Sequence, residues 1–293
     1  MLLPRFDFHE PATVTEACQM MAALGEAARP IAGGTDLLVN MKKKVLTPKH
    51  LVSLARIEAL HGIEAVNGHL AIGPCMTVSE LAESESIRHR LSALRAGARS
   101  LGTPLIRNLA TIGGNIGSAR PAADLPPALM VYGTTLVLEG SAGRREMAIG
   151  DFFKGPGMTA LAPGEIISEI RVDVPGPLSG AGYINIGVRK SQDCNIVNVA
   201  AFITLDSAGG AITEARIAMG CVGPTHLRAP SAEKALMGEK PSEALFAAAG
   251  EAATRDCRPI LDFRGSAEYR RAMVGVLTQR TLSVAHREIL ERC

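Results

Sequence analysis

The stretch Pro30-Ile31-Ala32-Gly33-Gly34-Thr35-Asp36-Leu37 decides how the first part of this chain is interpreted. The residues before the glycines predict a short buried strand, and residues 36–43 show a helical pattern that ends in lysines, as the helix dipole favours. Glycines between a strand and a helix let several backbone amides point toward one place without β-carbons in the way. The stretch therefore predicts a phosphate-binding turn. We expect Thr35 to add a hydroxyl donor and Asp36 to cap amides or reach ribose hydroxyls.

A second glycine segment, Thr111-Ile112-Gly113-Gly114-Asn115, has the same character. Asp124 follows it, and a carboxylate there can accept hydrogen bonds from ribityl or ribose hydroxyls. A lone Gly-Gly pair is usually only a turn, and neither segment is a G-x-G-x-x-G or a G-x-x-x-x-G-K-[ST] motif. Together the two segments predict a site for a phosphorylated cofactor between two domains.

Bulk properties limit the classes of function. The 293 residues are enough for two or three domains, and a net charge of +2 gives no general attraction to nucleic acid or anionic lipid. The chain has no run of 18 apolar residues, so no membrane span is expected, and its first residues do not resemble a signal peptide. The six cysteines form no C-x-x-C pair, which argues against a zinc or cysteine-ligated iron–sulfur site. We expect reduced thiols in the cytoplasm.

The order of predicted elements is α+β. Capping boxes of the form T-x-x-E at Thr13 and Thr77 each predict the start of a helix, the first ending near Gly25 and the second followed by another helix up to about residue 100. After a linker at residues 175–180, the pattern is three apolar strands followed by helices. The expected strands are 29–32, 51–54, 70–72, 135–139, 166–174, 183–188, 197–205 and 212–220, and the expected late helices are 231–237, 242–254 and 266–291.

These motifs carry a family resemblance. The chain resembles the FAD-binding medium subunit of molybdenum hydroxylases, the carbon monoxide dehydrogenase and xanthine dehydrogenase family, over nearly its whole length. The similar segments are residues 6–11 (FDFHEP), 28–37 (ARPIAGGTDL), 110–115 (ATIGGN), 163–167 (PGEII), 189–190 (RK) and 265–270 (GSAEYR). The resemblance implies a two-part FAD-binding domain of vanillyl-alcohol-oxidase (PCMH) type, residues 1–55 and 56–176. It also implies a C-terminal α+β domain of the CO dehydrogenase flavoprotein type, residues 177–293, with a three-stranded sheet and helices.

The resemblance implies which residues bind FAD. They are Pro30, Ile31, Ala32, Gly33, Gly34, Thr35, Asp36, Leu37, Leu101, Thr111, Ile112, Gly113, Gly114, Asn115, Asp124, Ile167 and Lys190. The glycine segments would wrap the pyrophosphate, Asp124 would bind the ribityl or nearby hydroxyls, and Leu101 and Ile167 would contact the flavin or adenine. Residues 189–198 would lie along the isoalloxazine, with Cys194 and Asn198 where family members often carry an aromatic residue or a lysine.

The expected flavin is non-covalent, because neither glycine segment has a histidine or cysteine for a flavin bond. No catalytic side chain and no metal ligand is expected, and His226 is interpreted as a loop histidine. The cysteine-rich insert of hydroxybenzoyl-CoA reductases is replaced by Ser118-Ala119-Arg120-Pro121, so no 4Fe–4S cluster is expected.

The resemblance also implies partners. The molybdenum cofactor and 2Fe–2S clusters would reside in separate subunits, in a dimer of heterotrimers. This oxidoreductase subunit would take electrons from the iron–sulfur subunit and pass them to an external acceptor. Two alternatives stay open: a free-standing FAD-dependent oxidoreductase of the same fold, and a cofactor-free assembly subunit.

Overall fold

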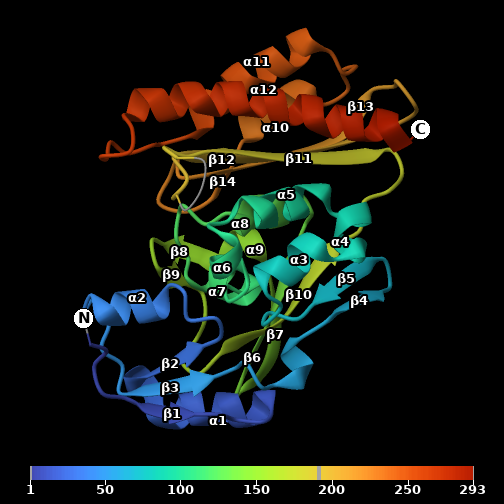
Figure 1. Ribbon diagram of the computed structural model, residues 1–293. Helices are drawn as coiled ribbons and strands as arrows, with labels where there is room; N and C mark the ends of the chain where they lie inside the picture. The colour runs from blue at the N-terminus through green and yellow to red at the C-terminus, as the bar shows by residue number, and fades with distance from the viewer. Residues whose placement is uncertain (1, 190–192, 293) are drawn as a thin grey trace.

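The computed structural model describes residues 2–189 and 193–292 and has the expected α+β architecture, with its strands gathered into separate sheets (Figure 1). The strands are β1 (Asp7–His9), β2 (Ala28–Ile31), β3 (His50–Ser53), β4 (Ile63–Val66), β5 (His69–Ile72), β6 (Thr135–Gly140), β7 (Gly143–Ala148), β8 (Phe153–Gly155), β9 (Met158–Thr159), β10 (Ile166–Asp173), β11 (Ser179–Ile186), β12 (Val197–Leu205), β13 (Ile212–Gly220) and β14 (Leu227–Arg228). The helices are α1 (Val14–Leu24), α2 (Leu37–Lys42), α3 (Val78–Glu83), α4 (Glu85–Arg90), α5 (Ser92–Ser100), α6 (Pro104–Arg107), α7 (Ile112–Gly117), α8 (Leu125–Val131), α9 (Ile149–Phe152), α10 (Pro230–Leu236), α11 (Glu243–Asp256) and α12 (Ala267–Arg292).

The first sheet is parallel, in the order β1-β3-β2, and α1 packs against it. The Thr13 hydroxyl accepts the Glu16 amide at 3.1 Å, as the sequence predicts, and Gly25 ends α1 with a φ of 54°. A capping box would also have the Glu16 carboxylate accept the amide of Thr13. It accepts the amide of the preceding residue, Ala12, at 2.8 Å. The chain therefore leaves β1 and enters α1 through a fixed turn.

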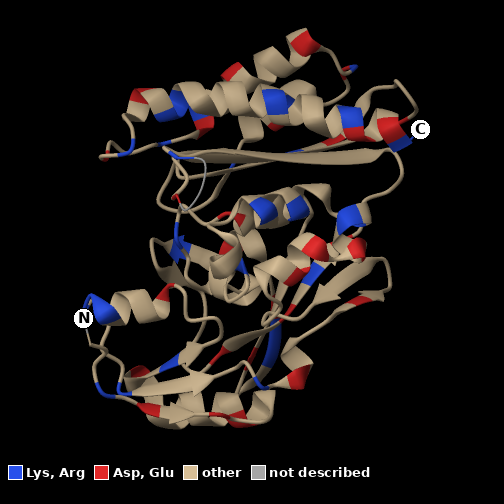
Figure 2. Ribbon diagram, in the orientation of Figure 1, with Lys and Arg blue, Asp and Glu red and all other residues tan. Residues whose placement is uncertain are grey.

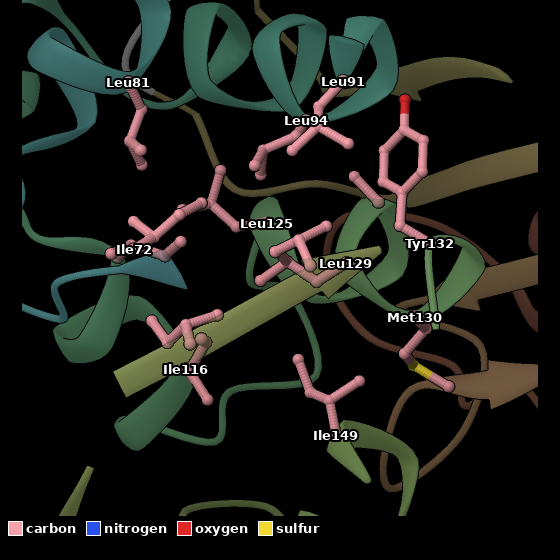
Figure 3. Packing of buried hydrophobic residues seen from close by; sticks show 14 of the residues in the cluster. Ile72, Leu81, Leu91, Leu94, Ile116, Leu125, Leu129, Met130, Tyr132 and Ile149 are labelled. Atoms are coloured by element: carbon pink, nitrogen blue, oxygen red, sulfur yellow. The ribbon is translucent and has the colours of Figure 1, made fainter. Parts of the chain in front are cut away.

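The second sheet is antiparallel, in the order β4-β5-β10-β6-β7, and its core is formed with the helices between β5 and β6. Figure 3 shows Leu94 of α5, Ile116 of α7 and Leu125 and Leu129 of α8 converging in this core. The capping box at Thr77 is complete, but the region up to residue 100 holds three helices, α3 to α5, where two are predicted. The helices thus bring the second glycine segment into the same core.

The third sheet, in the order β11-β12-β13-β14, is covered on both faces (Figure 1). Helix α12 packs against β11 and β12 on one side, while α5 packs against β11 and α8 against β12 and β13 on the other. Strand β12 is consequently buried along nearly its whole length. All three predicted long strands are present, β12 and β13 with the predicted bounds, and the two-residue β14 adds a fourth.

Strand β11 begins inside the stretch that the sequence predicts as a linker. Ser179 and Gly180 are buried and pair with β12, so the linker is shorter than expected and the strand begins and ends earlier. The division into residues 1–55, 56–176 and 177–293 stays a prediction. Both charge signs are interspersed along α12 and over the rest of the ribbon (Figure 2). Across the described residues, no helix combines the length and apolar character needed to cross a bilayer.

Candidate cofactor site

The two glycine segments meet at Gly33. A β-carbon on Gly33 would lie 1.7 Å from the carbonyl oxygen of Leu109, which precedes Ala110 and Thr111. No side chain fits in that space, because the backbones of two segments far apart in sequence are already in contact. The sequence prediction that the two segments build one site is therefore consistent with their placement in the fold.

The first segment presents free backbone donors. It follows β2, where Ile31 is buried, and precedes α2, which begins at Leu37. Gly34 has a φ of 71°, which favours glycine, and its carbonyl accepts the Leu38 amide at 3.0 Å. The amides of residues 33–36 donate no hydrogen bond to any residue that the structure describes. Four successive amides are unbonded and available as donors, and consecutive backbone N–H groups of this kind can bind phosphate oxygens.

Of the two roles expected of Asp36, the capping of amides is wrong, and contact with ribose hydroxyls stays a prediction. Its carboxylate caps no amide of α2, and it instead accepts Asn40 Nδ2 at 3.0 Å. Arg120, which follows the second glycine segment, places Nη2 3.6 Å from Asp36 Oδ2. The guanidinium offsets a negative charge that would otherwise oppose an anion at the neighbouring amides.

The second segment is a helix and not an open loop. Thr111 is the N-cap of α7, and its hydroxyl accepts the Gly114 amide at 3.0 Å. The other amides are also bonded: Ile112 N to Met76 O (3.0 Å), Gly113 N to Pro74 O (2.8 Å) and Asn115 N to Thr111 O (2.9 Å). The expectation that this segment has the same character as the first is wrong in this respect, since its amides are bonded and neither Gly113 nor Gly114 has a positive φ.

The physical reason for this helix is the core beneath it. Ile112 and Ile116 lie one helical turn apart and are both fully buried, so one apolar stripe anchors α7. A β-carbon on Gly113 would lie 2.6 Å from Pro74 Cβ, whereas Gly114 is exposed and one there would meet only Thr111 Oγ1, at 2.9 Å. Gly113 thus serves packing, and Gly114 leaves an outer surface open to a ligand.

Asp124 is linked to the second segment. Asn115 Oδ1 accepts the Leu125 amide at 3.2 Å, which ties α7 to the start of α8. The Asp124 carboxylate accepts Asn195 Nδ2 at 2.9 Å and the Ser100 hydroxyl at 3.4 Å. Burial raises the pKa of Asp124 to about 6, and these two hydrogen bonds act in the opposite direction. Sequence reasoning missed both contacts, because each partner is distant in sequence from Asp124: it placed Asn195 only within residues 189–198, along the isoalloxazine, and did not name Ser100.

The remaining predicted residues come from separate parts of the sequence and differ in accessibility. Leu101 and Ile167 are 7% and 6% exposed, in the core cluster that also holds Ile112. Lys190 lies outside the described residues. Cys194 is exposed, as a residue facing a ligand should be. The expectation that Asn198 lines a flavin is wrong, because its side chain is 0% exposed and its Nδ2 donates to Ala123 O and the Tyr183 hydroxyl within the protein.

His226 lies in a loop, as expected, and is buried. Neither ring nitrogen has a hydrogen-bond partner among the described residues, and the ring packs edge-on against Phe153 with centroids 4.9 Å apart. Burial lowers the pKa of His226 to about 4, so the imidazole is neutral at physiological pH. The geometry gives it a packing role.

Comparison with known proteins decides the family. Residues 4–175 match the family described as FAD binding domain in molybdopterin dehydrogenase. The chain belongs to this family. Residues 183–285 match the CO dehydrogenase flavoprotein C-terminal domain, so the expected family and fold are confirmed.

Relatives align over almost the full length of this FAD-binding family member. The carbon monoxide dehydrogenase medium chain of Hydrogenophaga pseudoflava is 34% identical, covering 97% of this chain and 98% of the relative. The nicotine 6-hydroxylase medium subunit of Paenarthrobacter nicotinovorans is 32% identical, covering 96% and 98%. A solved structure of carbon monoxide dehydrogenase from Hydrogenophaga pseudoflava, which lacks the Mo-pyranopterin moiety of its cofactor, matches with a TM-score of 0.94, 35% identity and complete coverage of both chains. The chain is therefore an FAD-binding oxidoreductase subunit, as expected.

The residues fit FAD on structural grounds as well. A dinucleotide needs donors for its pyrophosphate, and the unbonded amides of residues 33–36 supply them beside a backbone contact that only Gly33 permits. It also needs acceptors for its hydroxyls, and the Asp124 carboxylate, at the start of α8, is held by two hydrogen bonds.

Proposed function

We propose that this chain is the FAD-binding electron-transfer subunit of a molybdenum-containing hydroxylase or dehydrogenase. It takes electrons from an iron–sulfur subunit and passes them to an external acceptor. The observation that carries the proposal is the set of four unbonded amides at residues 33–36, placed where the two glycine segments meet. Full-length similarity to medium subunits of such enzymes supports the rest.

The residues take distinct roles in this proposal. The amides of residues 33–36 and the Thr35 hydroxyl bind the pyrophosphate, and the exposed face of α7 at Gly114 allows its close approach. Arg120 balances Asp36 beside that anion. Asp124 accepts from ribityl hydroxyls, while Leu101 and Ile167 border the flavin or adenine through the little surface they expose.

Bound FAD accepts electrons singly and releases them in pairs, which is the chemistry that the family's complexes need from this subunit. The protein binds the cofactor, orients it and excludes water from part of it. We assign no side chain to proton transfer. The complex is proposed to be a dimer of heterotrimers in the cytoplasm, where the five described free cysteines would stay reduced.

A cofactor assay tests the first half of the proposal. The purified chain is denatured, and the filtrate is analysed by chromatography and absorbance. We expect about one FAD per chain in the filtrate. FMN, flavin retained in the precipitate, or no flavin at all would contradict the proposal, and the last result would favour an assembly subunit.

Reconstitution tests the second half. The chain alone should hold FAD and be a poor catalyst toward small organic substrates. Co-expression with an iron–sulfur and a molybdenum subunit should give a stable complex in which substrate bleaches the flavin absorbance. Rapid substrate-driven bleaching in the isolated chain would instead identify a free-standing oxidoreductase.

A further inference from the structure

The segment of residues 121–124 is held by the C-terminal part of the chain. Three consecutive carbonyl oxygens accept hydrogen bonds from it: Pro121 O from Cys221 N (2.8 Å), Ala122 O from Asn195 Nδ2 (3.2 Å) and Ala123 O from Asn198 Nδ2 (3.0 Å). This segment connects α7 to α8 and ends at Asp124. Its conformation is therefore set by residues beyond position 176.

Asn195 has a second contact that reaches the carboxylate itself. Its Nδ2 also donates to Asp124 Oδ1 at 2.9 Å, so both of its amide protons are used on this segment. Its Oδ1 accepts Asn185 Nδ2 at 2.7 Å. With the side chain 4% exposed and each end occupied, the amide has one orientation available.

The backbone around Asn195 is fixed as well. Its carbonyl accepts the Cys221 thiol at 3.2 Å, and the next carbonyl, of Ile196, accepts Arg270 Nη1 at 2.7 Å. Arg270 is 2% exposed and pairs with Asp262 at 2.7 Å, which keeps this buried guanidinium in place. The network extends from α12 through Asn195 to Asp124.

We propose that Asn195 is a positioning residue for FAD, and that through it the C-terminal domain completes the cofactor site. Asn195 holds the Asp124 carboxylate in the orientation that accepts the cofactor's hydroxyls. This inference rests on the proposed function, in which Asp124 contacts the ribityl chain. Asn195, which is distant in sequence from both glycine segments, thereby controls the affinity for FAD through Asp124.

The surroundings of Asp124 make this role measurable. The titratable groups that face it are Tyr183 from β11 and Cys221 after β13, and neither is charged at neutral pH, because burial raises both pKa values. No charged side chain among the described residues contributes to the pKa shift of the Asp124 carboxylate. Its ionisation therefore depends on burial, which raises the pKa, and on hydrogen bonds from Asn195, Ser100, Tyr183 and the backbone, which lower it. Losing Asn195 removes one of these bonds and raises the pKa of Asp124 further.

The test compares two variants of the full chain, each of which loses contacts between the residues before position 176 and those after it. Asn195→Ala removes the bonds to residues 122 and 124. Glu288→Ala is the matched control, because Glu288 Oε2 accepts Ala181 N at 2.7 Å and the Ser92 hydroxyl at 2.9 Å, which joins α12 to α5 away from Asp124. The Kd for FAD is measured by flavin fluorescence from about pH 5 to about pH 8, a range that spans the titration of Asp124.

We expect Asn195→Ala to weaken FAD binding about tenfold at neutral pH, the usual size for one hydrogen bond to a charged group. The pH below which affinity falls should also move upward, which general loosening of the structure would not cause. Glu288→Ala should stay within about twofold of wild type. Asn195→Asp keeps the volume and an acceptor for Asn185, so it extends the test if the alanine variant unfolds. It should bind FAD still more weakly above about pH 7, where two carboxylates would face each other.

Wild-type affinity and an unchanged pH profile in both Asn195 variants would overturn the inference. An equal loss in Glu288→Ala would also overturn it, by showing that any contact between the two parts has the same effect. If the wild-type chain binds no FAD, the proposed function fails, and the inference fails with it. If wild type binds FAD and the Asn195 variants bind it equally well, the inference fails while the proposed function stands.

Discussion

The segments around Gly33-Gly34 and Gly113-Gly114 have similar sequences and different structures. In the first, four successive amides make no hydrogen bond within the described protein, and Gly34 has a positive φ. In the second, the amides of residues 112–115 are all bonded and the backbone is helical. The first segment thus has amides free to donate to a ligand, whereas the second offers an exposed glycine surface, which we propose lies beside that ligand.

This difference separates two uses of glycine that a sequence pattern merges. Gly33 permits contact between two backbones and Gly34 permits a turn, whereas Gly114 lies on an exposed helical surface where its lack of a side chain keeps space open. Substitutions in and beside the two segments should therefore differ in how strongly they change the free energy of unfolding and the binding of FAD.

Gly33→Val should have the largest effect. Its β-carbon would fall 1.7 Å from the Leu109 carbonyl oxygen, so the two segments must separate. We expect a loss of about 3 kcal/mol in unfolding free energy, together with loss of FAD. Urea denaturation and flavin content measure the two effects. A variant with wild-type stability would show that the contact between the segments is unimportant.

Asp124→Asn should change stability in the opposite direction. Folding raises the pKa of Asp124 from 3.8 to about 6, so the folded state favours the protonated form, and wild-type stability falls as pH rises through that range. Above about pH 7 the FAD-free variant should be more stable by about 2 kcal/mol, because asparagine carries no charge to bury and the site keeps some solvent exposure.

Denaturation of both FAD-free proteins at about pH 4 and about pH 7.5 measures this difference, which should nearly vanish at the lower pH. FAD binding by Asp124→Asn should be weaker at neutral pH. If Asp124→Asn is less stable than wild type at both pH values, burial of the ionised Asp124 carboxylate does not destabilise the folded protein.

Thr111→Ala should remove the N-cap of α7, since the hydroxyl accepts the Gly114 amide at 3.0 Å. The expected loss is about 1 kcal/mol, the usual value of a threonine cap. Thr111→Ser keeps the hydroxyl and serves as the control in thermal unfolding followed by circular dichroism. If serine and alanine behave alike, the capping bond is not what holds the second segment.

Gly114→Val should have the smallest effect on the fold and a large one on the cofactor. The new β-carbon would lie 2.9 Å from Thr111 Oγ1, so that side chain must shift, at a cost below the roughly 1 kcal/mol of losing its capping bond entirely. Valine and glycine themselves differ by less than about 1 kcal/mol in helix propensity. The branched side chain would cover the surface that a phosphate approaches. Far-ultraviolet circular dichroism should match wild type while flavin content is lost. Full flavin occupancy would show that the second segment has no part in the site.

The sequence predicts most of this fold because its signals are local. The hydroxyls of Thr13 and Thr77 cap the helices that they were expected to cap, and the long strands after residue 176 follow their apolar runs. The helix α7 was missed, since three of its six residues are glycines of low helix propensity and tertiary burial of Ile112 and Ile116 stabilises it.

The contacts that orient the candidate site could not be predicted, because they also depend on the tertiary fold. Asn195 and Asp124 are distant in sequence, and no local pattern marks an asparagine as the donor to a particular carboxylate. The position of Gly33 against Leu109 is likewise a product of the tertiary fold. A resemblance to a family supplies the glycine segments and Asp124 but not the contacts that orient them.

The sheet β11-β12-β13-β14 is covered by α12 on one face and by α5 and α8 on the other, and this affects how the chain is made. Helices α5 and α8 leave the ribosome before the strands that cover them exist. At 5–20 residues per second, the remaining part takes on the order of ten seconds to synthesise, and during that time an apolar surface stays uncovered. The nascent chain should therefore bind holdase chaperones in this interval, and a message truncated near codon 176 should yield aggregated protein in place of a small flavoprotein.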